Sequence, residues 1–191
     1  MRGNVNTQEH RGRLAARLAA LRIQHDKSLE DLSFASGISR ASLSRIERGE
    51  VSPTAEVLNQ LCGVYGMTMS RLISEIEPAA DNLLRAKQQT LWQDELNGFE
   101  RRILSPPSNQ YRCELIEGKL RPGSLIEYLN PPLQGLEQYI YLYMGELTIT
   151  MNAEKWVMQE GDSLRFHLSG KSSFNTNERQ GAHYLLVVCK S

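Results

Sequence analysis

Residues 36–54 read SGISRASLSRIERGEVSPT, and this stretch decides how the first part of the chain folds. Gly37 can adopt a positive φ without the penalty that a Cβ imposes, so we expect it to end one helix, and Ser39 can cap the next. Ser52 followed by Pro53 is an N-cap with proline at the first helical position. These boundaries predict a short helix that lies between two others.

The apolar residues from Thr7 to about Ser74 recur at helical spacing. Ser28 and Asp31, three residues apart, resemble a capping box at the start of a second helix. The segments predicted as helices are 9–25, 29–36, 40–48, 53–65 and 69–75.

The predicted helix at 40–48 has two unlike faces. Leu43 and Ile46 point to one side, which leaves serines, an alanine and arginines on the remaining surface. Small side chains let a helix enter the major groove of DNA, and arginines can contact guanine edges or phosphates. For an isolated helix, a solvated polar face is the more common explanation of this pattern, so the rest of the chain has to decide.

The whole stretch from Leu14 to Ile73 resembles the helix-turn-helix domain of the lambda-repressor-like (Xre-type) family. The resemblance rests on a leucine-rich first helix, an L-x-x-L second helix, GIS at the turn, SRIERG closing the third helix and SPT opening the fourth. Ser33 and Phe34 depart from the small alanine that often occupies the second helix. The resemblance implies that the segment from Arg40 to Arg48 is a recognition helix.

The DNA-contacting residues follow from this resemblance by position. Those predicted are Lys27, Ser28, Ser39, Arg40, Ala41, Ser42, Ser44, Arg45, Arg48, Ser52 and Thr54. Lys27 and the amide end of the helix after Ser28 are expected to hold phosphate. Glu47 is interpreted as a structural partner of Arg48 or of a loop amide. Arg13 and Arg17 face either solvent or DNA.

After Pro78 the pattern changes to short β runs separated by turns. The runs are YRCELIEG, SLIEYL, QYIYLYM, ELTITM, EKWVMQ, DSLRFHL and HYLLVVCK. Residues 79–97 are ambiguous, because AADNLLRAK is compatible with a helix while Asn97-Gly98 suggests a hairpin. Seven or more strands without intervening helices indicate an antiparallel sandwich or barrel.

The β part resembles the cupin barrel as it occurs fused behind Xre-type domains. The resemblance rests on PG at 122–123, GELTI at 145–149, GDS ending at 163, FHLSG at 166–170 and a late Asn at 175 or 177. It implies a multidomain chain, helical and then β: a five-helix lambda-repressor-like domain at 7–76, a linker and the start of the β domain at 77–97, and an antiparallel cupin jelly roll at 98–191.

Metal-dependent cupins bind a divalent ion through histidines and a glutamate. By the resemblance, those positions fall on Gln138, near Pro132 and Gln134, and near Ser172 or Ser173, none of which is a typical ligand. We therefore expect no metal, no other cofactor and no catalytic residue. A rearranged site from His167, His183 and Glu137 is the alternative.

The predicted barrel retains residues suited to binding a small polar metabolite, an amino acid being one candidate. The pocket candidates are Gln138, Arg165, His167, Ser172 and His183. In QYIYLYM the resemblance directs Gln138 inward, so the alternating Tyr139, Tyr141 and Tyr143 face outward, where they pack against a neighbouring strand or form a dimer interface.

Composition supports the same class of protein. The 191-residue chain has a net charge of zero, yet residues 1–74 carry ten Lys and Arg against seven Asp and Glu. No run of about 18 apolar residues occurs, so no membrane span is expected. Three distant cysteines, at 62, 113 and 189, suggest free buried thiols in a reducing cytoplasm.

Together these features predict a dimeric, non-enzymatic, sequence-specific transcriptional regulator of the bacterial type, associated with the nucleoid. Its partners would be an inverted-repeat operator in double-stranded DNA and a small effector. The alternatives are a cupin enzyme localised by its helical domain, and an antitoxin-like repressor whose β domain binds another protein.

Overall fold

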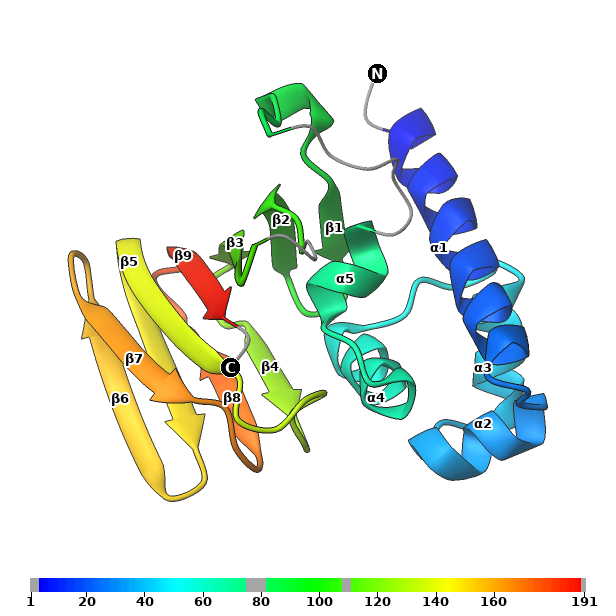
Figure 1. Ribbon diagram of the computed structural model, residues 1–191. Coiled ribbons are helices and arrows are strands. Elements are labelled where there is room, and N and C mark those ends of the chain that lie inside the picture. The colour runs from blue at the N-terminus through cyan, green and yellow to red at the C-terminus, as the bar shows by residue number, and fades with distance from the viewer. Residues whose placement is uncertain (1–3, 75–81, 108–110, 190–191) are drawn as a thin grey trace.

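All five predicted helices form. The computed structural model describes residues 4–74, 82–107 and 111–189 (Figure 1). Its helices are α1 (Asn4–Gln24), α2 (Leu29–Ser36), α3 (Arg40–Glu47), α4 (Ala55–Tyr65) and α5 (Met69–Ser74). Four of the five starts and all five ends lie within two residues of the prediction, and α1 begins five residues earlier than expected.

The helix boundaries follow the capping chemistry of the sequence. The predicted capping box is confirmed, since Ser28 Oγ accepts from the Asp31 amide at 3.0 Å and Asp31 Oδ2 accepts from the Ser28 amide at 2.9 Å. Gly37 ends α2 with φ 73°, a left-handed conformation that favours glycine. Ser39 caps α3 by accepting from the Ser42 amide at 3.2 Å.

The cap of α4 differs from the prediction. Thr54, and not Ser52, is the N-cap, because the Thr54 hydroxyl accepts from the Val57 amide at 3.3 Å and the helix begins at Ala55. Pro53 therefore precedes the helix. Three consecutive residues compatible with a helix start made the position ambiguous by two residues.

The described residues of the β part form nine antiparallel strands, in agreement with the predicted class. They are β1 (Leu91–Asp94), β2 (Phe99–Ser105), β3 (Cys113–Leu120), β4 (Leu125–Tyr128), β5 (Glu137–Met151), β6 (Glu154–Gln159), β7 (Ser163–His167), β8 (Ser172–Asn175) and β9 (Ala182–Cys189). The strand order is β1-β2-β3-β9-β5-β8-β4, with β6 and β7 also paired to β5.

The long strand β5 folds this sheet into two layers. Its residues 137–141 pair with β7 and β9, whereas residues 146–151 pair with β6 and β8. Between the two halves the register shifts, and Gly145 adopts φ 90°, with no room for a Cβ against the carbonyl of Gly181. A glycine at this bend lets one strand serve both layers of the curled, cupin-type sheet.

The segment at 79–97, whose structure the sequence left ambiguous, contains no α-helix among its described residues and includes strand β1. Residues 79–81 lie outside the described residues, and the remainder forms a single 3-10 turn (Ala86–Gln88) before β1. The hairpin at Asn97-Gly98 is confirmed, with Gly98 at φ 67° and the Asn97 amide donating to Asp94 Oδ1 at 3.2 Å. Strand β1 thus begins inside the stretch assigned to the linker.

Helices α4 and α5 lie between the sheet and α1–α3 (Figure 1). Asp94 Oδ2 accepts from the amide of Ala55 at the start of α4 at 2.9 Å, and Asn59 Nδ2 donates to the carbonyl of Asn130 at 2.7 Å. One hydrophobic cluster runs from the helices into the sheet without a break. The helical part is therefore packed directly on the barrel, so a change at the contact can reach α1–α3.

Candidate functional site

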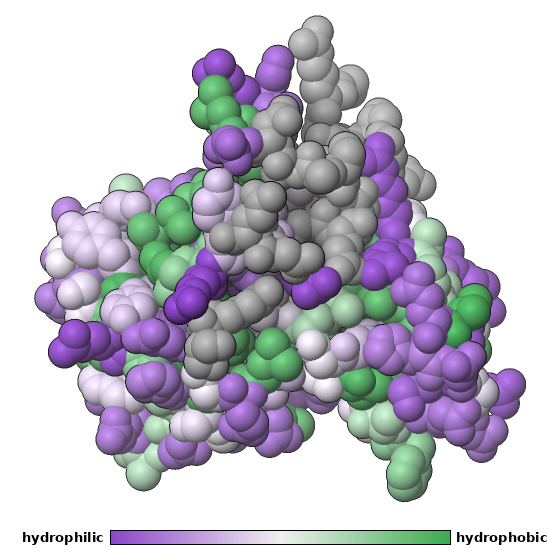
Figure 2. All heavy atoms as spheres, viewed as in Figure 1, coloured by the Kyte–Doolittle hydropathy of each residue, from purple (hydrophilic) through white to green (hydrophobic). Residues whose placement is uncertain are grey.

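Helix α3 presents the face that the sequence predicts. Leu43 and Ile46 are 1% and 4% exposed and join the core, while Arg40, Ala41 and Arg45 are exposed. Hydrophilic side chains gather over the α1–α3 end of the molecule (Figure 2). The arrangement leaves the polar side of α3 open to a large partner.

An ion pair fixes the C-terminal end of α3 against α1. Arg22 Nε and Nη2 donate to the two oxygens of Glu47 at 2.8 and 3.0 Å, and Arg22 Nη1 donates to the carbonyl of Lys27 at 2.9 Å. The hydrogen bond to Glu47 raises the pKa of Arg22 despite its burial. Glu47 is the structural residue that the sequence suggested, but its partner is Arg22 rather than Arg48.

The amide end of α2 already has an internal anion. Asp31 accepts from the hydroxyl and the amide of Ser28, and these two bonds lower the pKa of its carboxyl group. An ionised Asp31 occupies donors that a phosphate would otherwise use. Of the two residues proposed for phosphate contact there, Ser28 is exposed but engaged, and Lys27 is half-buried.

The two arginines at the end of α3 share a carboxylate. Arg48 Nε lies 2.7 Å from Glu50 Oε1 and Arg45 Nε lies 3.5 Å from Glu50 Oε2, with all three side chains about half exposed. The Arg48 hydrogen bond is the main cause that lowers the pKa of Glu50. Ser52 is exposed beyond this turn, whereas the hydroxyl of Thr54 is engaged as a cap.

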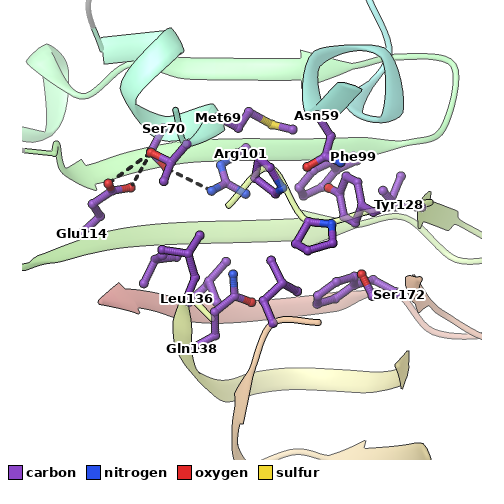
Figure 3. A pocket seen from close by; sticks show the side chains of 18 of the residues that line it. Asn59, Met69, Ser70, Phe99, Arg101, Glu114, Tyr128, Leu136, Gln138 and Ser172 are labelled. Carbon is purple, nitrogen blue, oxygen red and sulfur yellow. Dashed lines mark hydrogen bonds between the residues drawn. The ribbon is translucent and has the colours of Figure 1, made fainter. Parts of the chain in front are cut away.

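A cavity lies where the helical part meets the barrel. We call it the junction cavity; it measures about 60 Å³ (Figure 3). Its helical wall consists of Asn59, Thr68, Met69 and Ser70. Its barrel wall consists of Phe99, Arg101, Glu114, Ile126, Tyr128, Pro131, Pro132, Leu136, Gln138, Leu168, Ser172, Phe174, Tyr184, Leu186 and Val188. The cavity is therefore shared by two parts of the molecule.

Two hydrogen bonds cross the junction cavity from α5 to the barrel. Arg101 Nη2 donates to Ser70 Oγ at 2.9 Å, and the Thr68 hydroxyl donates to the Glu114 carboxylate at 3.2 and 3.4 Å (Figure 3). Thr68 also caps α5, since it accepts from the amide of Arg71 at 3.1 Å. The position of α5 is thus coupled to two charged residues of the barrel.

The five predicted pocket residues separate into two groups. Gln138 and Ser172 are 7% and 3% exposed and line the junction cavity. Arg165, His167 and His183 do not line it. The first two occupy outward register positions of β7 and are exposed, and His183 lies on the outer face of β9.

The outer face carries the tyrosine stripe. Tyr139, Tyr141 and Tyr143 are 38%, 43% and 46% exposed, and the rings of Tyr141 and Tyr143 lie 5.3 Å apart edge to face. The ring of Tyr143 also lies 5.3 Å from that of His183. His183 Nε2 lies 2.7 Å from Glu117 Oε1. The stripe therefore does not pack under a neighbouring strand.

The rearranged metal site is not assembled in the described part of the chain. His183 contacts Glu117, while Glu137 accepts from the hydroxyl of Tyr139. Among the described residues, no three histidine, cysteine, aspartate or glutamate side chains converge as ligands.

Two of the three cysteines are not free, contrary to the sequence-based expectation. Cys113 and Cys189 face each other in the register of β3 and β9, with Cα atoms 4.2 Å apart, and form a disulfide. Cys62 is a free, fully buried thiol, and burial raises its pKa to about 12. A spacing of 76 residues gave no sign of this pairing, because only the strand register brings the ends together.

The residues that sequence reasoning missed are the polar members of the junction cavity other than Gln138 and Ser172. Arg101 lies in the inward register of β2 between Phe99 and Ile103, and Glu114 lies two residues before the buried Ile116 in β3. A charged residue on the apolar side of an alternating strand was the available signal.

Residues 18–72 match the helix-turn-helix family model HTH_3. Together with the five-helix arrangement, this match identifies residues 18–72 as a helix-turn-helix domain of that family, and an antiparallel cupin-type sheet follows it. No helix in the described part of the chain is long and apolar enough to cross a membrane.

The named relatives of this chain are helix-turn-helix transcriptional regulators, in agreement with the match over residues 18–72. The chain is 23% identical to the HTH-type transcriptional regulator SutR of Escherichia coli K12, over 92% of this chain and 93% of the relative. It is 25% identical to the regulator PuuR of the same organism, over 83% and 85%. A crystal structure of an HTH_3 family transcriptional regulator from Vibrio cholerae shares the fold, with a TM-score of 0.77 and 22% identity over 97% of this chain and 99% of the other.

Proposed function

We propose that this regulator binds an inverted-repeat operator as a homodimer and that a small metabolite in the junction cavity changes its affinity for that operator. The observation that carries this proposal is the pair of hydrogen bonds from Thr68 and Ser70 to Glu114 and Arg101. They join α5 to two barrel residues that line the junction cavity. A molecule bound there contacts both sides of the junction.

The DNA-binding part of the proposal rests on α3. In this mode α3 enters the major groove, and Arg40, Ser42 and Arg45 reach base edges or neighbouring phosphates. The ion pair of Arg22 with Glu47 holds the opposite side of α3 on α1, so the exposed side is presented in one orientation. In a dimer, two such helices would lie about 34 Å apart, one turn of DNA.

The tyrosine stripe supports the dimer. Tyr139, Tyr141 and Tyr143 lie in one row on the outer face of β5, more than a third exposed. Aromatic side chains are enriched at interfaces between subunits, and an inverted repeat requires two copies of α3. We expect a second copy to cover this stripe, which sedimentation of the tyrosine-to-serine variants would test.

The effector part follows from linkage. A ligand shifts the equilibrium between two arrangements only if it binds one of them more tightly. The walls of the junction cavity belong to α4, α5 and the barrel, so their spacing changes whenever the helical part moves on the barrel. Ligand affinity and operator affinity are coupled through that spacing.

DNase footprinting on the DNA that flanks the gene is the test. We expect protection of an inverted repeat, with an affinity that falls steeply as salt is raised. Arg45→Ala should lower binding to the operator by about tenfold or more while reducing discrimination at particular base pairs. Arg165→Ala is the matched control, because Arg165 is an exposed arginine on β7 of the barrel.

Two results would count against the proposal. Absence of any protected repeat at low salt would contradict sequence-specific binding. An equal loss of affinity for operator and random DNA in Arg45→Ala would reduce Arg45 to a phosphate contact and shift base reading to Arg40 and Ser42.

A further inference from the structure

We propose that the junction cavity binds a small zwitterion of the α-amino-acid type, its carboxylate on Arg101 and its ammonium group on Glu114. This inference rests on the proposed function only in treating the junction cavity as the effector site. It assigns the chemical class of the effector from the charges that line the cavity.

Arg101 has hydrogen-bonding capacity that the protein does not use. It is 9% exposed, its Nη2 donates to Ser70, and its Nε is buried without a hydrogen-bond partner in the described part of the chain. A guanidinium group carries five N–H donors in a planar fork that matches a carboxylate. A buried donor left unpaired is costly, so Arg101 favours a ligand that brings an anion.

Glu114 has acceptor sites that the protein does not use. It is 2% exposed, and the one hydrogen-bond donor found for its side chain among the described residues is the hydroxyl of Thr68, shared between both oxygens at 3.2 and 3.4 Å. An ionised carboxylate has about four acceptor sites. Among the described residues, the side-chain partner found for Glu114 is Thr68 and that found for Arg101 is Ser70, and no ion pair joins the two charged groups. The two opposite charges line one cavity without neutralising each other directly.

The pair of charges selects the class of ligand. A simple anion would bind Arg101 but would be repelled by Glu114. A simple amine would bind Glu114 but would be repelled by Arg101. Like charges brought together out of water disfavour binding, whereas an opposite charge at each end favours it. A molecule that carries both an ammonium and a carboxylate group satisfies both residues.

The remaining walls limit the rest of the ligand. Gln138 and Ser172 offer an amide and a hydroxyl to the cavity. Phe99, Ile126 and Phe174 form apolar walls. A cavity of about 60 Å³ with such walls suits a short apolar or slightly polar side chain better than a long or charged one.

Binding of this kind would act on α5. The ammonium group would bind Glu114 beside Thr68, and the carboxylate would bind Arg101 beside Ser70. Thr68 and Ser70 both lie at the start of α5, so the ligand would alter the geometry of the two bonds that join α5 to the barrel. The effector thereby favours a different position of the helical part.

The test is a thermal-shift screen of the full chain with the standard L-α-amino acids, followed by calorimetric titration of the best one. We expect at least one of them to raise the melting temperature by a few degrees at saturating concentration. For valine, two analogues each lack one charged group: isobutylamine lacks the carboxylate, and 3-methylbutanoate lacks the ammonium group. We call these analogues the amine half and the carboxylate half. The amino acid should bind at least about tenfold more tightly than either corresponding half.

Substitutions at the two charged residues should remove the preference for the amino acid over one half or the other. Glu114→Gln, which keeps the shape and the acceptor for Thr68, should remove most of the advantage of the amino acid over its carboxylate half. Arg101→Gln should do the same relative to the amine half, and Arg101→Lys should restore part of the preference because it restores the charge. Arg165→Gln, on the outer face, should change neither ratio.

Several outcomes would overturn the inference. It fails if none of the standard amino acids binds the wild-type chain, if either half binds as tightly as the amino acid, or if Glu114→Gln leaves the ratios unchanged. A footprint measured on the same protein without ligand separates the two proposals. A protected operator together with a failed ligand screen removes only the zwitterion, whereas a missing footprint removes the proposed function.

Discussion

Removal of the ion pair between Arg22 and Glu47 should destabilise the helical part far more than removal of a chemically identical pair on the surface. The Arg22 and Glu47 side chains are 18% and 11% exposed and meet through two bonds of 2.8 and 3.0 Å. The comparison pair, Arg48 and Glu50, has an Nε–Oε1 distance of 2.7 Å but side chains that are 59% and 46% exposed. The two pairs differ mainly in access to water.

The expected magnitude follows from that difference. Two unit charges about 4 Å apart attract by about 4 kcal/mol at an effective dielectric constant of about 20, and the loss of hydration offsets part of this. We therefore expect a coupling energy of about 2 kcal/mol between Arg22 and Glu47. For the exposed pair, screening by water and side-chain entropy reduce the expectation to about 0.5 kcal/mol.

A double-mutant cycle measures both values. The cycle compares urea unfolding, followed by helical ellipticity, of each single alanine variant with that of the double variant. Glu47→Ala alone should cost about 3 kcal/mol of unfolding free energy, because it leaves the guanidinium group of Arg22 largely buried without its partner. Operator affinity should fall as well, since α3 loses its attachment to α1.

A coupling energy between Arg22 and Glu47 no larger than that between Arg48 and Glu50 would contradict the expected effect of burial. Equal values would mean that the partial exposure of the inner pair already screens its charges. An unchanged operator affinity in Glu47→Ala would separately show that the ion pair does not set the orientation of α3.

Three further predictions concern the stability of the whole chain. Gly145→Ala should lower the free energy of unfolding by at least about 2 kcal/mol, because φ is 90° and the new methyl group meets a backbone carbonyl. Gly63→Ala, on the exposed face of α4, should raise it by about 0.5–1 kcal/mol. Urea unfolding measures both values, and equal effects would contradict the geometry. Partial burial alone would raise the pKa of Glu117, but the hydrogen bond from His183 and nearby cations lower it. The contribution of ionised Glu117 to stability is therefore complete above its ordinary pKa of 4.5 and is lost as the pH falls through the lower pKa of the folded chain. In Glu117→Gln the melting temperature should fall less steeply over that acid range. A fall as steep as in the wild-type chain would argue against the contact. Reduction of the disulfide, which closes a loop of 76 residues, should cost up to about 4 kcal/mol, and thiol titration of the unfolded, unreduced chain should find one free thiol; three would contradict the bond.

The regular elements were predictable because each depends on neighbours in the sequence. A capping box such as Ser28 with Asp31, or a glycine such as Gly37 at φ 73°, acts over three or four residues, so the sequence contains the whole cause. The hairpin at Asn97-Gly98 belongs to the same kind. The cap of α4 was misplaced because Ser52 and Thr54 are chemically equivalent, and only the path of the chain decides between them.

The outward row of tyrosines was also within reach, because the cupin resemblance places Gln138 inward and strand alternation then places the tyrosines on the opposite side. Residue type alone does not show on which side of a strand a side chain lies. Arg165 and His167 were proposed for a pocket from residue type alone, and both lie on the outer face of β7. The disulfide could not be predicted for a different reason, because Cys113 and Cys189 meet only through the register of β3 with β9.

Prediction of the junction cavity would have required two observations that the pattern of a single strand does not contain. The inward position of Arg101 and of Glu114 conflicts with the apolar residues around them, and such a conflict in a strand usually marks a partner supplied from elsewhere. The partners are Ser70 and Thr68, which the sequence shows only as the polar start of a short helix. Neither observation has meaning until α5 is placed against β2 and β3. That placement depends on packing between two parts of the chain, so the sequence alone does not predict the proposed effector site. Substitution of its two charged residues should change ligand preference without changing the fold.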